Sequence, residues 1–109
     1  MTAATITCVQ CHLLTQDTSA SAISWAGGNL RYWNTALIEV TTESGLRGFG
    51  EAYYPGLSAP LATRALVENY APLIIGEDAT EASRLVHKMR SESLAWGKAG
   101  LPLMVAGSI

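Results

Sequence analysis

The first residues that could do chemistry form the run Cys8-Val-Gln-Cys11-His12. Its spacing matches the C-x-x-C-H sequence to which c-type haem is attached. A structural zinc site needs about four ligands, and beyond these three the chain offers only the distant His87 and carboxylates. The segment alternates as a β-strand, which would send Cys8 and Cys11 to opposite faces. We therefore expect two free thiols in a strand and keep a c-type haem protein as an alternative.

The composition limits the classes of partner. The chain has 109 residues, enough for one domain, of which 49% are hydrophobic and 15% charged, against about 25% charged in a usual globular domain. That excess of apolar residues suggests a surface that something else covers. The net charge is −2, with seven basic residues scattered singly, which argues against nucleic acid. No secretory signal or membrane-spanning run is visible, so we expect a cytoplasmic protein that binds no membrane.

A β-hairpin is predicted over residues 36–54. Ala36, Ile38 and Val40 alternate with polar neighbours, the pattern of a half-buried strand. Ser44-Gly45 supplies the tight turn, because glycine adopts a positive φ without steric cost. The second arm carries Gly48 and Gly50 on one face, where a backbone or a helix could approach closely.

Residues 4–14 are predicted to form a first strand, and residues 16–31 a long loop. Loops longer than about 12–15 residues are uncommon in compact domains unless they are functional or disordered. The large rings of Trp25 and its aromatic neighbours argue against disorder. We interpret this loop as a flap that closes over something. The alternative is a surface loop whose aromatic side chains plug into the domain.

Helical patterns follow the hairpin. Pro60 fits the first turn of a helix, with Leu61, Ala65, Leu66 and Tyr70 near one face and Pro72 at its end. Asp78-Ala-Thr-Glu81 has capping-box spacing. The helix after it places one apolar face opposite a charged one, the apolar face being Ala82, Leu85, Val86, Met89 and Trp96. Residues 101–109 begin another helix. The order of strand, hairpin and helices predicts an α+β fold.

Three segments carry a family resemblance. They are Val40-Thr-Thr-Glu-Ser-Gly-Leu-Arg-Gly-Phe-Gly-Glu51, Ala71-Pro-Leu-Ile-Ile-Gly-Glu-Asp78 and the run from Gly100 to Ile109. In this order they resemble the N-terminal capping domain of the mandelate racemase/muconate lactonising enzymes of the enolase superfamily. The resemblance implies a three-stranded antiparallel meander followed by helices. It also implies a capping domain over residues 1–99, with residues 100–109 starting a (β/α)₇β barrel.

In that family the barrel supplies a lysine or histidine base and carboxylate ligands for Mg²⁺. The base removes a proton α to a substrate carboxylate, and the metal stabilises the enediolate. Racemases, epimerases, acid-sugar dehydratases and cycloisomerases share this chemistry. A barrel takes on the order of 250 residues, so we expect a fragment without catalytic residues or metal ligands of its own, inactive by itself. The partners implied are a small carboxylate substrate and the barrel domain.

The family's cap contacts substrate through two segments, which correspond here to residues 16–31 and 52–58. On that basis Trp25, Arg31, Tyr53 and Tyr54 are candidate substrate contacts. Arg31 could form a bidentate ion pair with the substrate carboxylate. The alternative interpretation, a solvated surface arginine without a role in binding, carries at least equal weight. For Glu51, which closes the hairpin motif, we expect a structural hydrogen bond rather than catalysis.

A different class of function stays open. Without a barrel, the apolar surface of the helices and sheet would be exposed, and such patches favour self-association. The alternative hypothesis is therefore a stand-alone binding or oligomerisation module, and a homo-oligomer is expected under either hypothesis.

Overall fold

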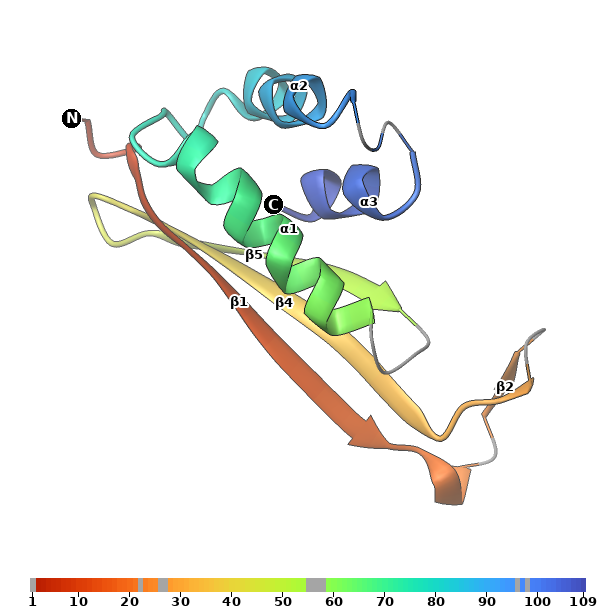
Figure 1. Cartoon of the computed structure of the whole chain (residues 1–109). Coiled ribbons are helices and arrows are strands. Elements are labelled where there is room, and N and C mark those ends of the chain that lie inside the picture. Colours follow the sequence, from red (N-terminus) through yellow and green to blue (C-terminus); the bar gives the residue numbers. More distant parts are fainter. Residues whose placement is uncertain (1, 22, 26–27, 55–58, 96, 98) are drawn as a thin grey trace.

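The computed structural model is an α+β domain in which three helices cover one face of a three-stranded antiparallel sheet (Figure 1). It describes residues 2–21, 23–25, 28–54, 59–95, 97 and 99–109. The elements are β1 (Ile6–Asp17), a 3₁₀ turn (Ser19–Ser21), β2 (Ser24–Trp25), β3 (Gly28–Asn29), β4 (Tyr32–Thr42), β5 (Arg47–Tyr54), α1 (Ala59–Ile74), α2 (Ala82–Glu92) and α3 (Leu101–Ser108). The strand order β1-β4-β5 confirms the predicted meander.

The β4–β5 hairpin is the predicted one. Gly45 has a φ of 83°, and its N–H donates to the Thr42 carbonyl at 2.9 Å, closing the turn. Ala36 and Ile38 face the helices and are buried. One face of the sheet therefore belongs to the core, and the other, which we call the open face, carries the alternate residues.

A close approach was expected at both Gly48 and Gly50, and it occurs at Gly50. A Cβ added there would lie 1.7 Å from the Ser108 carbonyl oxygen, so the end of α3 rests directly on β5. At Gly48 nothing lies within 4 Å of such an atom.

The predictions for α1 were partly wrong. Leu61, placed on the apolar face, is 62% exposed, whereas Val67, Tyr70 and Ile74 are buried. Thr63 completes this buried face, and a polar residue at that position concealed the 3.6-residue period. The helix also continues past Pro72 to Ile74. Proline removes only one backbone bond near a helix end, and the burial of Ile74 in the core compensates for it.

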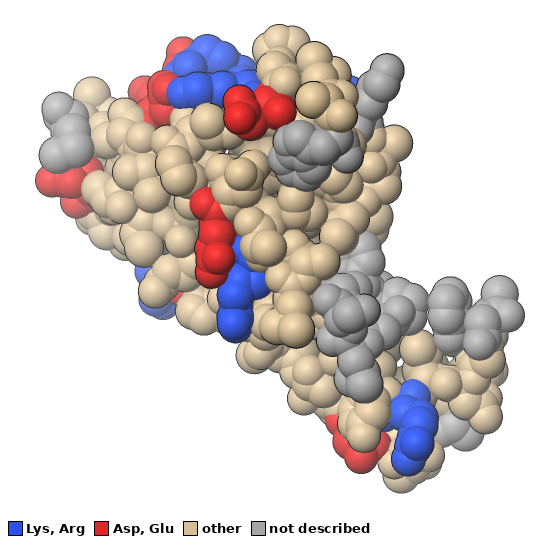
Figure 2. Space-filling view, in the orientation of Figure 1, with Lys and Arg blue, Asp and Glu red and all other residues tan. Residues whose placement is uncertain are grey.

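The predicted capping box before α2 does not form. The Asp78 carboxylate accepts hydrogen bonds from the N–H and hydroxyl of Thr80, at 2.9 and 2.7 Å. Glu81 makes no capping bond and binds the Arg84 guanidinium instead, with Nε 2.7 Å from Oε2. Arg84 offers Glu81 two N–H donors and a full positive charge, whereas the capping site offers a single backbone N–H. Acidic and basic side chains lie side by side over α2 (Figure 2).

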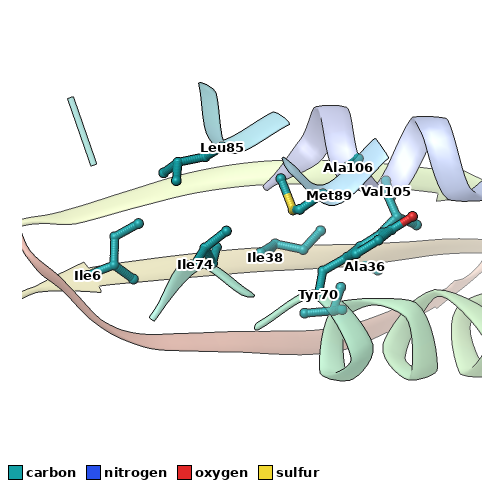
Figure 3. Packing of buried hydrophobic residues seen from close by; sticks show 11 residues of the cluster. Ile6, Ala36, Ile38, Tyr70, Ile74, Leu85, Met89, Val105 and Ala106 are labelled. Carbon is teal, nitrogen blue, oxygen red and sulfur yellow. The ribbon is translucent and has the colours of Figure 1, made fainter. Parts of the chain in front are cut away.

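The core lies between the sheet and the helices (Figure 3). Leu85 and Met89 fill it from α2, as predicted, and Val105 and Ala106 fill it from α3. Trp96, predicted on the same face of α2, lies outside the described residues. The predicted helix from residue 101 is confirmed, and the Tyr70 hydroxyl donates to the Pro102 carbonyl at 3.4 Å. The boundary at residue 99 stays a prediction.

Candidate functional site

The two segments expected to contact substrate start from the same end of the sheet. Asp17 pairs with Tyr32 where β1 ends and β4 begins. Tyr54, where β5 ends, pairs with Asn34 of β4. The described parts of residues 16–31 and 52–58 therefore meet at the same end of the sheet, and β2 projects beyond the ends of β1 and β4 (Figure 1).

Residues 16–31, which we call the flap, have more structure than the predicted loop. β1 runs on to Asp17, a 3₁₀ turn follows, and β2 pairs with β3 as a short antiparallel ribbon. The Leu30 N–H donates to the Ile23 carbonyl at 2.8 Å. The prediction of one long loop over residues 16–31 was therefore only partly right, because β1 extends to Asp17 and a local antiparallel pairing gives the segment backbone bonds of its own.

Thr18 fastens the base of the flap. Its hydroxyl donates to the Leu30 carbonyl at 2.8 Å, and its N–H donates to the Arg31 carbonyl at 2.8 Å. The side chain is buried. A neighbouring polar pair, Thr15 and Asn34, is joined at 2.8 Å between hydroxyl and amide oxygen. The sequence analysis missed these residues, although Thr and Asn within an apolar strand are a signal of side-chain bonding.

Arg31 is exposed at the base of the flap. It lies near Asp17, whose pKa is lowered mainly by hydrogen bonds from the side chain and N–H of Ser19 and, to a smaller extent, by the charge of Arg31. Arg31 thus has a nearby carboxylate within its own chain and a guanidinium open to solvent. This placement is compatible with its predicted role in binding a carboxylate.

The other three candidates are placed through their backbones alone. Trp25 ends β2, and Tyr53 and Tyr54 end β5. Their side chains lie outside the described part of the structure. The backbone puts all three at the flap end of the sheet, and their contact with substrate stays a prediction.

The two cysteines do not converge. Cys8 pairs with Thr41 and Cys11 with Ile38, so the strand sends them to opposite faces. Both are free thiols. Cys11 lies in a hollow between β1 and α1, where burial raises the pKa of its thiol; Arg64 lowers it and Glu68 raises it by smaller amounts. This geometry gives no support to haem attachment.

The open face carries an ion network that the sequence analysis missed. The Glu39 carboxylate binds His12 Nε2 at 3.0 Å and Arg47 Nη1 at 2.9 Å. Glu39 is mostly buried under these two partners. Glu51 accepts a hydrogen bond from the Thr35 hydroxyl at 2.5 Å, which is the structural role expected of it. Alternation was the signal for this network, because His12, Glu39 and Arg47 all fall on the face of the sheet opposite the buried Ile38.

An apolar groove of about 350 Å³ lies at the opposite end of the sheet, between α2 and the hairpin. Its walls include Val40, Leu46, Gly48, Val86, Met89 and Ile109. The groove is remote from the flap, so it is no part of the predicted substrate site.

The described residues contain neither a metal-binding cluster nor a helix that could span a membrane. Among the described residues, no three His, Cys, Asp or Glu side chains come together as a metal site would require. Glu39, the most enclosed carboxylate of the sheet, already faces a guanidinium. Within the same residues, no helix is both long and apolar enough to cross a bilayer.

Solved structures share this fold. An enolase from Bradyrhizobium, complexed with magnesium and mandelic acid, is similar at 24% identity and a TM-score of 0.83, over 99% of this chain and 29% of that one. An enolase from alpha proteobacterium BAL199 with bound magnesium has 16% identity and a TM-score of 0.84, over 95% and 28%. An enolase-superfamily member from Polaromonas sp. JS666 has 27% identity and a TM-score of 0.76, over 91% and 26%.

The chain thus spans less than a third of the length of these structures. No curated protein matches the sequence. The family model described as "Mandelate racemase / muconate lactonizing enzyme, N-terminal domain" matches residues 9–107, nearly the whole chain. With the meander, the helices on one face and the flap at one end of the sheet, this match shows that the chain belongs to the mandelate racemase/muconate lactonizing enzyme N-terminal domain family of the enolase superfamily.

Proposed function

We propose that this chain is the capping domain of a Mg²⁺-dependent enzyme that removes a proton α to a carboxylate. The reaction would be that of a racemase or epimerase, an acid-sugar dehydratase or a cycloisomerase. The observation that supports this most directly is the shared origin of residues 16–31 and 52–58 at one end of the sheet. Two adjacent segments can cover a substrate that a single loop would leave open to water.

In this proposal the chain's own residues select and shield substrate. Arg31 binds the substrate carboxylate, and Trp25, Tyr53 and Tyr54 supply aromatic surface around it. The Thr18 hydroxyl and N–H hold the flap in position by their bonds to Leu30 and Arg31. The base and the Mg²⁺ ligands belong, in this proposal, to a barrel domain toward which residues 100–109 lead. The isolated 109-residue chain is then inactive.

Exchange of the flap tests the specificity role. Residues 16–31 would replace the corresponding segment of the Bradyrhizobium enolase, and kcat and KM would be measured on a panel of 2-hydroxy acids and acid sugars. We expect KM values to change in a substrate-dependent way while Mg²⁺-dependent α-proton exchange persists. Transplanting residues 42–46, the turn at the other end of the sheet, is the matched control and should change nothing.

A chimera whose substrate preference is unaltered, or is altered equally by the control, would contradict the proposal. Proton exchange into D₂O by the 109-residue chain alone, with Mg²⁺ and the same acids, would show that a base and metal ligands lie within it. Proton NMR measures the α-proton exchange, both for the chimera and for the 109-residue chain.

Exposed apolar surface decides between the capping role and the alternative of a stand-alone binding module. Leu103 and Met104 of α3 are exposed, and the apolar groove beside α2 is open. If the chain remains monomeric and binds little hydrophobic dye, it is a stand-alone module that needs no barrel domain to cover its apolar surface. Strong dye binding that disappears on adding a barrel domain would favour the capping role.

A further inference from the structure

β5 is an edge strand with free backbone groups. The Thr42 N–H donates to the Leu46 carbonyl at 2.9 Å, and bonded and non-bonded pairs alternate along an antiparallel ladder. By this alternation the backbone groups of Arg47, Phe49 and Glu51 point away from β4. Within the described residues, none of these groups is bonded to another element. Such an edge can accept another strand.

The side chains at these positions form a symmetric pattern on the open face. Phe49 is 57% exposed, and the side chain of Arg47, with its guanidinium carbon 5.6 Å from the Phe49 ring centroid, is 58% exposed. Glu51, at the same distance along the strand on the other side of Phe49, is also exposed. A positive charge, an aromatic ring and a negative charge thus follow one another at every second residue.

We propose that two copies of this chain pair through β5, antiparallel, about a two-fold axis beside Phe49. Arg47 of each copy then lies opposite Glu51 of the other, and the two Phe49 rings meet at the axis. Residues directly opposite in an antiparallel pair have Cβ atoms about 4.5–5.5 Å apart. The contact is closed and self-complementary, as a two-fold dimer requires.

The arrangement of the charges distinguishes β5 from an edge strand that is protected against pairing with another chain. Charged residues commonly stop edge strands from pairing, and charges of one sign would repel a second copy. Opposite charges placed symmetrically about Phe49 instead attract in the antiparallel arrangement. The outer strand at the other edge, β1, presents Cys8, Gln10, His12 and Leu14 on the open face, with no such pair of charges.

On the core side of the sheet, the end of α3 meets an uncovered glycine in this arrangement. The end of α3 rests over Gly50, and the axis at residue 49 brings Gly50 of one copy beside Gly48 of the other. Nothing lies within 4 Å of the Cβ position at Gly48. The end of α3 in each copy therefore comes next to open space on its neighbour.

Charge reversal tests the dimer. Analytical ultracentrifugation of the 109-residue chain should show a monomer–dimer equilibrium. Arg47→Glu and Glu51→Arg should each weaken dimerisation by about tenfold or more, because both symmetry-related pairs become repulsive. An equimolar mixture of the two variants should form a heterodimer about as tight as the wild-type dimer, because both pairs are again of opposite sign. Arg90→Glu and Glu43→Arg, with exposed positions on α2 and in the turn, are the matched controls and should behave as wild type.

Three outcomes would overturn the proposal: a monomeric wild type, association indifferent to the two reversals, or a mixture no tighter than either variant alone. Association through exposed apolar surface predicts the second outcome. Arg47→Glu also removes a partner of Glu39, so circular dichroism must show each variant folded. If Arg47→Glu fails to fold, Glu51→Arg decides alone, since it leaves that ion pair intact.

Discussion

At the scale of single residues, Gly50 is, among the glycines that the structure describes, the one with least room for a side chain. A Cβ there would meet the carbonyl oxygen and carbonyl carbon of Ser108 at 1.7 and 2.8 Å, and backbone atoms cannot rotate away as a side chain can. We expect Gly50→Ala to lower the free energy of unfolding by about 1–3 kcal/mol, the usual cost of overpacking. Urea denaturation measures this.

Gly48→Ala is the control for Gly50→Ala, because it lies on the same face of the same strand with open space around it. Alanine limits the unfolded chain more than glycine does, so the control should be neutral or stabilise by up to about 1 kcal/mol. Equal effects at both positions would contradict the close packing of α3 on β5.

Thr18 provides a test of flap anchoring. Thr18→Val keeps the shape of the side chain but removes its bond to the Leu30 carbonyl. We expect a loss of about 1 kcal/mol in flap closure, seen as hydrogen exchange about fivefold faster at the Leu30 amide and as faster proteolysis within residues 19–30. Thr7→Val also removes a bond to a backbone carbonyl, that of Thr41, at the far end of β1. It should leave flap exchange unchanged; a flap equally affected by both variants would not depend on Thr18.

At the scale of elements, the sequence pattern correctly predicted the features that depend on neighbouring residues in the chain. The β4–β5 hairpin followed from alternation and a glycine turn, and the apolar face of α2 followed from Leu85 and Met89. α1 was misread because Thr63 is buried and Leu61 exposed, a choice made by the sheet and α3 rather than by the helix. The location of the candidate site at one end of the sheet was predicted from the family resemblance. The short ribbon of β2 and β3 inside the flap was predicted neither by the local sequence pattern nor by the resemblance.

The link between α1 and α2 should make stability depend on acid pH. Hydrogen bonds from Lys88 and then Arg84 hold the pKa of Glu77 at about 2, against an ordinary value of 4.5. Because the folded-state pKa is depressed, the stabilisation is complete above pH 4.5 and is lost as the pH falls toward 2. Glu77→Gln should therefore flatten the decline of the urea midpoint in that window. Glu43→Gln, in the hairpin turn, should retain the wild-type slope; a Glu77→Gln chain with that slope would exclude Glu77 as the cause.

At the scale of the whole molecule, the two ends of the sheet differ in what they carry. The flap end carries Arg31 and the aromatic candidates, whereas the hairpin end carries the apolar groove. The helices close one face, and the open face holds the Glu39 network and the edge at Phe49. Under the two proposals, substrate selection uses the flap end of the sheet and association uses the middle of the β5 edge, where Glu51 stands two residues before Tyr53. A variant at Arg31 can therefore leave the dimer edge intact.

The predicted domain boundary at residue 99 can be tested by deleting α3. Val105 and Ala106 have no exposed surface, and Pro102 accepts the Tyr70 hydroxyl bond. Burial of one valine side chain contributes about 1.5–3 kcal/mol, out of about 5–15 kcal/mol for a whole domain. A chain ending at Ala99 should therefore unfold at clearly lower urea concentration and less cooperatively. Met104→Ala, at a half-exposed position of α3, should cost far less. An unchanged midpoint after the deletion would assign residues 100–109 to the proposed barrel domain alone. The expected loss of stability would make α3 part of the cap's own core.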